Sequence, residues 1–159
     1  MQSECTNEPT VPECELCRFL ADVPVSEQSQ SFFETPSYRL IWAQEPGYPC
    51  WLRLIAREHV REMTHLDAES RMAIFQALCV VEQVVLEQLE PVKLNWASFG
   101  NMVPHLHWHM IPRFVDDRHF PSPSWGEPRR QDSLPLLAWQ ESRKQSLQQQ
   151  LIETLSGNV

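Results

Sequence analysis

Three of the six histidines lie within five residues, at His105, His107 and His109. Side chains alternate across an extended strand, so these imidazoles are expected to share one face, with about 6–7 Å between neighbours. A neutral imidazole is a good nucleophile near pH 7, and it is also a common zinc ligand. Three interpretations are therefore open: a solvent-facing polar strand, a metal site, or nucleophilic catalysis on phosphorus. A row of three alternating histidines disfavours the first.

The cysteines provide a second group of side chains with chemical potential. Their number, five, is odd and their spacing does not resemble a disulfide framework, which predicts reduced thiols or a metal site. Only Cys14 and Cys17 form a close pair, and a gap of two residues lets two thiolates bind one zinc ion. A complete zinc site needs four ligands, so the pair alone leaves both free thiols and zinc open.

The histidines are expected to lie on a strand over residues 105–114, because polar and apolar residues alternate there. The apolar residues between and after the histidines are expected to face the core: Leu106, Trp108 and Met110. A neighbouring strand is predicted over 94–99, and Gly100-Asn101 breaks it. Residues 38–42 and 51–55 favour two further strands, joined as a hairpin by turn residues at 45–49.

One long helix is predicted over residues 67–90, where apolar residues recur at helical spacing. Asp67 resembles an N-cap and Pro91 marks the end. Residues 116–135 contain four prolines and are expected to be irregular. A C-terminal helix is indicated by apolar residues at helical spacing from Leu147 to Leu155.

Composition restricts the class of protein. A chain of 159 residues fits one domain, and 42% hydrophobic with 21% charged residues is ordinary for a folded protein. The net charge of −8 argues against binding a nucleic-acid polymer, although a small phosphate needs only a local pocket. No N-terminal apolar run resembles a secretion signal, and the longest apolar stretches are too short and too interrupted to span a bilayer, which predicts a cytoplasmic protein without membrane contact.

The segment His105-Leu106-His107-Trp108-His109-Met110-Ile111 matches the His-x-His-x-His-x-x signature, so the chain resembles the histidine triad family. The similarity covers residues 14–125 and includes a strand and glycine turn at 94–101. A segment like 114–125 makes it most similar to the bacterial branch resembling diadenosine tetraphosphate hydrolases. This resemblance implies an α+β fold, with an antiparallel sheet of about five strands, a long helix packed on it, and a homodimer. The expected division is a flexible lead (1–13), the histidine triad domain (14–125) and a C-terminal extension with a helix (126–159).

The resemblance also implies roles for individual residues. His107 would attack the α-phosphorus of a nucleotide and form a covalent nucleotidyl-histidine, while His109 would donate a hydrogen bond to phosphate or leaving-group oxygen. Substrate-binding residues are expected at the end of the neighbouring strand and in the glycine turn: Asn95, Gly100, Asn101, Met102 and Val103. Backbone N–H groups of this turn would stabilise the developing charge. The expected substrates are dinucleoside polyphosphates or nucleoside phosphoramidates, with no cofactor needed for catalysis.

The same resemblance completes the zinc site, because some members add one histidine before the long helix and the first histidine of the triad. His59 and His105 match those positions beside Cys14 and Cys17, which predicts a structural zinc as the alternative to free thiols. Two other functions stay open: a zinc-dependent hydrolase that uses all three histidines as ligands, and a nucleotide-binding module without turnover.

Two positions depart from the family pattern. Many relatives carry Ser or Thr where this chain has Met102, so a side-chain contact to phosphate is lost. Relatives also tend to open the strand at 51–55 with a histidine, whereas this chain has Trp51. Polar support of the triad from that position is therefore not expected.

Overall fold

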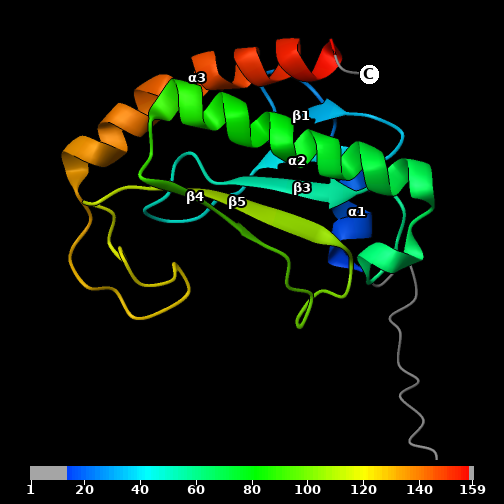
Figure 1. Ribbon diagram of the computed structural model, residues 1–159, viewed down its shortest axis with the longest axis horizontal. Coiled ribbons are helices and arrows are strands. Elements are labelled where there is room, and N and C mark those ends of the chain that lie inside the picture. Colours follow the sequence, from blue (N-terminus) through cyan, green and yellow to red (C-terminus); the bar gives the residue numbers. More distant parts are fainter. Residues whose placement is uncertain (1–13, 158–159) are drawn as a thin grey trace, which may run out of the picture.

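The computed structural model describes residues 14–157, so the predicted lead at 1–13 lies outside the described residues. The described chain is built around one five-stranded antiparallel sheet, in the order β1-β2-β3-β5-β4 (Figure 1). The strands are β1 (Ser31–Glu34), β2 (Tyr38–Trp42), β3 (Leu52–Ala56), β4 (Lys93–Ala97) and β5 (His107–Arg113). The helices are α1 (Glu15–Asp22), α2 (Ala68–Leu89), α3 (Leu134–Ser156) and a short 3-10 helix, η2 (Met63–His65). The predicted α+β class, with its long helix and C-terminal helix, is confirmed.

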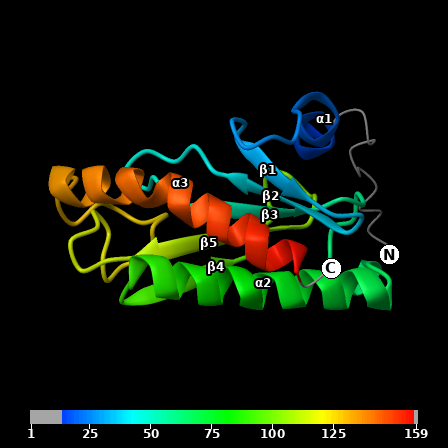
Figure 2. The ribbon, with the colours of Figure 1, turned by 90° about the horizontal axis from the view of Figure 1, so that it is seen from above.

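Different helices cover the two faces of the sheet (Figure 2). Leu40, Leu54 and Met110 point to one face, where they share a buried core with α2 and α3. Ile41 and Ile55 point to the other face and pack against α1. Because side chains alternate along a strand, the histidines of β5 lie on the α1 face while the intervening residues enter the larger core. The predicted orientation of Leu106, Trp108 and Met110 toward the core is confirmed.

Helix α2 agrees with the helix predicted over 67–90. Asp67 caps it, since its carboxylate accepts a hydrogen bond from the Ser70 N–H at 2.8 Å. By length and composition alone α2 could cross a membrane, but the core helices of soluble proteins also have this length and composition. In this fold one side of α2 packs on the sheet through residues such as Leu78 and Val85.

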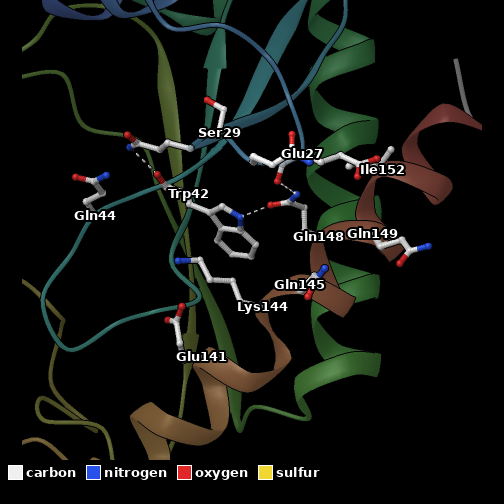
Figure 3. A pocket seen from close by; sticks show the side chains of 12 residues that line it. Glu27, Ser29, Trp42, Gln44, Glu141, Lys144, Gln145, Gln148, Gln149 and Ile152 are labelled. Carbon is white, nitrogen blue, oxygen red and sulfur yellow. Dashed lines mark hydrogen bonds between the residues drawn. The ribbon is translucent and has the colours of Figure 1, made fainter.

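Helix α3 begins at Leu134, earlier than the apolar spacing predicted. The proline content of the preceding segment concealed this start, although a proline in the first turn of a helix is well tolerated. Trp42 connects α3 to the sheet, because its indole N–H donates to Gln148 Oε1 at 2.7 Å and the Lys144 ammonium lies 5.1 Å from its ring (Figure 3). Trp42, Lys144 and Gln148 line a cavity of about 670 Å³ beside α3, and none of the triad histidines lines it.

Three short elements were not predicted, namely α1, β1 and η2. They have eight, four and three residues, which carry too little periodicity to be recognised. The histidine strand is also shorter than expected. The His105 N–H donates to the Val103 carbonyl at 2.8 Å, so the chain is still turning at His105 and β5 begins at His107.

Candidate active site

His107 and His109 lie in the interior of the sheet on β5, between β3 and β4. His107 is paired with Ile55 and His109 with Arg53 across the β3–β5 ladder. Both imidazoles are buried, and their ring centroids are 5.0 Å apart. Strand pairing on both sides therefore fixes the two rings relative to each other.

The hydrogen bond of His107 determines which ring nitrogen is free. Its Nδ1 lies 2.6 Å from the His105 carbonyl oxygen. A carbonyl can only accept, so Nδ1 carries the proton and Nε2 keeps an unprotonated lone pair. Burial lowers the pKa of His107, and the nearby positive charge of Arg53 acts in the same direction. This imidazole is thus neutral, with one nitrogen prepared for nucleophilic attack.

His109 has the opposite arrangement. The Trp51 indole N–H donates to His109 Nδ1 at 3.0 Å. Because Nδ1 accepts, the proton of the neutral ring is on Nε2, which becomes a hydrogen-bond donor. Burial, with the charges of Arg53 and His107, lowers the pKa of His109 to about 3. The expectation that position 51 gives the triad no polar support is wrong, because an indole N–H supplies the hydrogen bond.

An open cavity of about 550 Å³ lies beside the two histidines. Its other lining residues come from α1, β3, the turn after β4 and the segment after β5: Glu15, Leu16, Arg53, Phe99, Gly100, Asn101, Met102, Val103 and Trp125. The turn depends on Gly100, whose φ of 134° favours glycine. The structure thus brings the predicted turn residues 100–103 to the histidines, with the Met102 side chain 92% exposed.

Asn95 is the predicted binding residue that does not line this cavity. Its Oδ1 accepts a hydrogen bond from Arg113 at 2.8 Å. Arg113 also forms a buried ion pair with Asp117 at 2.8 Å and donates to the Ser122 carbonyl at 2.9 Å. This network holds the segment after β5 against the sheet and gives Asn95 a structural partner.

Trp125 closes one side of the cavity. Its ring packs edge to face against Trp51, Phe99 and His109, with centroid distances of 5.1, 4.6 and 5.4 Å. An aromatic wall therefore surrounds His109, formed by residues that are far apart in the sequence. Trp125 thus both packs against its neighbours and lines the cavity.

His105 belongs to a different group of side chains. Its Nε2 donates to the Ala56 carbonyl at 2.8 Å, which leaves Nδ1 with a lone pair facing the cysteines. That Nδ1 lies 3.5 Å from Cys14 Sγ and 3.4 Å from Cys17 Sγ, and His59 Nδ1 lies 3.2 Å from Cys17 Sγ. The four predicted metal ligands thus gather in one place, with all ligand atoms within 4.8 Å of one another.

This geometry fits zinc. In a tetrahedral site with Zn–S near 2.3 Å and Zn–N near 2.0–2.1 Å, sulfur and nitrogen ligands are about 3.5 Å apart. The distances of 3.2–3.5 Å between the sulfur and nitrogen atoms are close to that value. The His105–Ala56 hydrogen bond also orients the imidazole, as outer contacts of metal-bound histidines usually do.

Arg53 is a residue of the cavity that sequence reasoning did not single out. It is the one charged side chain in the apolar stretch 51–55, and this was the available signal. Its Cα is paired with His109, so its side chain starts from the same face of the sheet.

Comparison with known proteins agrees with this architecture. The HIT domain model matches residues 25–116, more than half of the chain. A histidine triad protein from Marinobacter aquaeolei is 27% identical, with a TM-score of 0.60, covering 84% of this chain and 94% of that one. One from Bradyrhizobium japonicum is 26% identical, with a TM-score of 0.60 and coverage of 77% and 91%.

A zinc-bound histidine triad family protein from Mycobacterium smegmatis has the same fold, with a TM-score of 0.62 at 17% identity, covering 93% of this chain and 99% of that one. No curated protein matches the chain. The family model, the two closer structures and the paired histidines of β5 agree, and the chain belongs to the histidine triad (HIT) domain family.

Proposed function

We propose that this protein is a nucleotide hydrolase or nucleotidyltransferase that works through a covalent nucleotidyl intermediate on His107. Proteins of the HIT family are generally nucleotide-binding hydrolases or transferases. The observation that carries the proposal is the pair of complementary tautomers: His107 has a free Nε2 lone pair, and His109 beside it presents an Nε2–H donor.

In the first step, the His107 Nε2 lone pair attacks the α-phosphorus of the substrate. A nitrogen–phosphorus bond forms, and the bond from phosphorus to the leaving-group oxygen breaks with its electron pair on that oxygen. His109 donates a hydrogen bond to a phosphate or leaving-group oxygen. Backbone N–H groups of Asn101 to Val103 stabilise charge on the phosphoryl oxygens, in place of a side-chain hydroxyl that Met102 lacks.

In the second step, an acceptor oxygen attacks the same phosphorus. The nitrogen–phosphorus bond breaks and its electron pair returns to His107 Nε2, so the nucleophile is regenerated. With water as acceptor the proton passes to solvent and a nucleoside monophosphate is released. With another hydroxyl or phosphate the enzyme is a transferase.

The structure bears on the choice of leaving group. A neutral His109 has one proton, on Nε2, and giving it away would create an unfavourable imidazolate. A polyphosphate leaves as an anion and needs only a hydrogen bond, whereas an amine needs a proton. This favours dinucleoside polyphosphates over phosphoramidates as substrates.

We also propose that Cys14, Cys17, His59 and His105 hold a structural zinc ion. The ion would tie α1 to the start of β5 and take no part in the reaction. The alternative of a hydrolase with all three histidines on one zinc has less support, because His105 Nδ1 faces the cysteines and Nδ1 of both His107 and His109 is engaged elsewhere.

Mass spectrometry of trapped intermediates tests the proposal. Incubation with diadenosine polyphosphates followed by acid-free quenching is expected to give a nucleotidyl adduct on His107. His107→Ala should lack the adduct and lose at least about 10³-fold in turnover, whereas His65→Ala, outside the cavity, should behave like the wild type. Full turnover in His107→Ala would exclude the mechanism, and binding without product would identify a non-catalytic module.

A further inference from the structure

We propose that Arg53 is a further catalytic residue of this site, whose guanidinium binds the phosphoryl oxygens of the group that His107 attacks. The inference rests on the proposed function and names the cation that the reaction would use. Two observations support it: Arg53 lines the same cavity as His107 and His109, and one of its hydrogen-bond donors is unpaired among the described residues.

Arg53 lies in the middle of β3, a strand with neighbours on both sides. It is paired with Ile41 on β2 and with His109 on β5. Directly opposed residues in an antiparallel pair share a face and lie about 4.5–5.5 Å apart at Cβ. Its side chain thus starts beside His109, and the cavity that contains His107 and His109 is also lined by Arg53.

The guanidinium has unused hydrogen-bonding capacity. Its Nε is buried and has no hydrogen-bond partner among residues 14–157. The ion pair formed by Arg53 joins Nη2 to Glu45 Oε1 at 3.5 Å, longer than a charge-assisted hydrogen bond, and Glu45 is 38% exposed. Glu15 is the other charged residue that lines the cavity, and no ion pair joins it to Arg53 within residues 14–157. A largely buried guanidinium with an unpaired donor is costly. An anionic ligand in the cavity that Arg53 lines would compensate its positive charge.

The chemistry of the ligand follows from the shape of the group. A guanidinium presents parallel N–H donors that match two oxygens of one phosphate, which a point charge cannot do. The other lining of the cavity is largely apolar or aromatic and includes Leu16, Phe99 and Trp125. A cation beside apolar walls suits a nucleoside phosphate, with the phosphoryl group held between Arg53 and His107.

The test compares the affinity of the protein for a nucleoside monophosphate with its affinity for the corresponding nucleoside, which lacks the phosphate. Calorimetry measures the affinities of the four common ribonucleoside monophosphates and their nucleosides for the wild type, Arg53→Met and Arg53→Lys. In Arg53→Met the best monophosphate should bind about 10–100-fold more weakly, while its nucleoside binds within about twofold of the wild type. Arg53→Lys should lie between, because it keeps the charge and loses the planar fork.

Glu45→Gln is the matched control, since it removes the ion-pair partner of Arg53 and leaves the guanidinium in place. It should bind the monophosphate at least as tightly as the wild type. Equal losses for phosphate and nucleoside in Arg53→Met, a loss in Glu45→Gln equal to that in Arg53→Met, or no monophosphate binding by the wild type would overturn the inference. Arg53→Lys, which preserves size and charge, keeps the test valid if Arg53→Met folds poorly.

The adduct on His107 separates this inference from the proposed function. If phosphate binding depends on Arg53 but no adduct forms in the wild type, Arg53 binds anions and the covalent mechanism fails. If the adduct forms at the same rate in Arg53→Met as in the wild type, the mechanism stands and the role of Arg53 is disproved.

Discussion

At the scale of single residues, the tautomers of His107 and His109 are each set by one neighbouring group. The Trp51 indole N–H, at 3.0 Å, requires His109 to carry its proton on Nε2. Trp51→Phe keeps an aromatic ring but removes that donor, so the tautomer of His109 is expected to become mixed. We expect turnover to fall about tenfold, since a hydrogen bond of this kind contributes about 1 kcal/mol and positions a reacting group.

Nitrogen NMR of labelled histidine measures the tautomer directly in both proteins. Trp125→Phe is the matched control, because Trp125 packs edge to face on the same imidazole at 5.4 Å. It should leave the His109 tautomer unchanged. An unaltered tautomer in Trp51→Phe would show that the indole N–H does not hold the proton in place.

The pKa of His109 makes a prediction about stability. Its value falls from 6.5 to about 3 in the folded protein, mainly through burial. Below pH 6.5 the unfolded chain therefore binds a proton that the folded chain does not, and the free energy of unfolding must fall as the pH is lowered toward 3. The slope from one such group is at most about 1.4 kcal/mol per pH unit.

Urea denaturation at pH 7.5, 6.0 and 5.0 measures this slope. His109→Asn removes the titrating group, so its stability should depend less steeply on pH than that of the wild type. Identical slopes in the two proteins would contradict the lowered pKa of His109.

At the scale of elements, the cluster of two cysteines and two histidines connects α1 to β5. Cys17→Ser removes the sulfur atom that lies 3.2 Å from His59 Nδ1 and 3.4 Å from His105 Nδ1. We expect bound zinc, measured by elemental analysis, to fall from about one ion per chain to well below one. Hydrogen exchange in α1 should become faster, because this eight-residue helix buries only Leu16 and Leu20.

Cys79→Ser is the control, since Cys79 is exposed on α2 and outside the cluster. It should retain zinc and the protection of α1. Wild-type protein that contains no zinc after purification in zinc-supplemented medium would favour the alternative of free thiols.

At the scale of the whole molecule, two surfaces that meet at one side of the sheet support the proposed homodimer. Strand β4 is an edge strand, so part of its backbone can pair with a second chain. Beside it, α2 exposes Met72, Phe75 and Leu86 at helical spacing. Exposed apolar side chains in a row are typical of interfaces between proteins.

Phe75→Glu should therefore shift the protein from dimer to monomer in light scattering after gel filtration. A buried charge opposite a second apolar helix costs several kcal/mol, which is enough to dissociate a micromolar dimer. Leu134→Glu, at an exposed residue of α3, is the control and should not change the mass. A wild-type protein that is monomeric at high concentration would refute the dimer.

Much of the fold could be predicted because it is recorded in local patterns. The helix over 67–90, the hairpin and the alternation around His107 follow from periods of 3.6 and 2.0, which depend on neighbours along the chain. The short elements α1 and β1 and the first half of α3 were not recognised, because tertiary contacts rather than apolar periodicity hold them. In the first half of α3, the Gln140 carbonyl accepts a hydrogen bond at 3.4 Å from the thiol of Cys50, which is 90 residues away in the chain.

The sequence by itself determined the reacting residue types, their common face and the family to which they belong. Only the tertiary structure decided the proton positions on His107 and His109, the Trp51 hydrogen bond, the gathering of the four metal ligands and the place of Arg53 beside His109. The proton on His107 is set by a carbonyl two residues away, on a backbone that folding has shaped. The others depend on contacts between strands or loops that are far apart in the chain, such as Trp51 and His109, which are separated by 58 positions. Hydrogen bonds and charges act over a few ångströms, so chemistry of this kind exists only once folding has brought those side chains together.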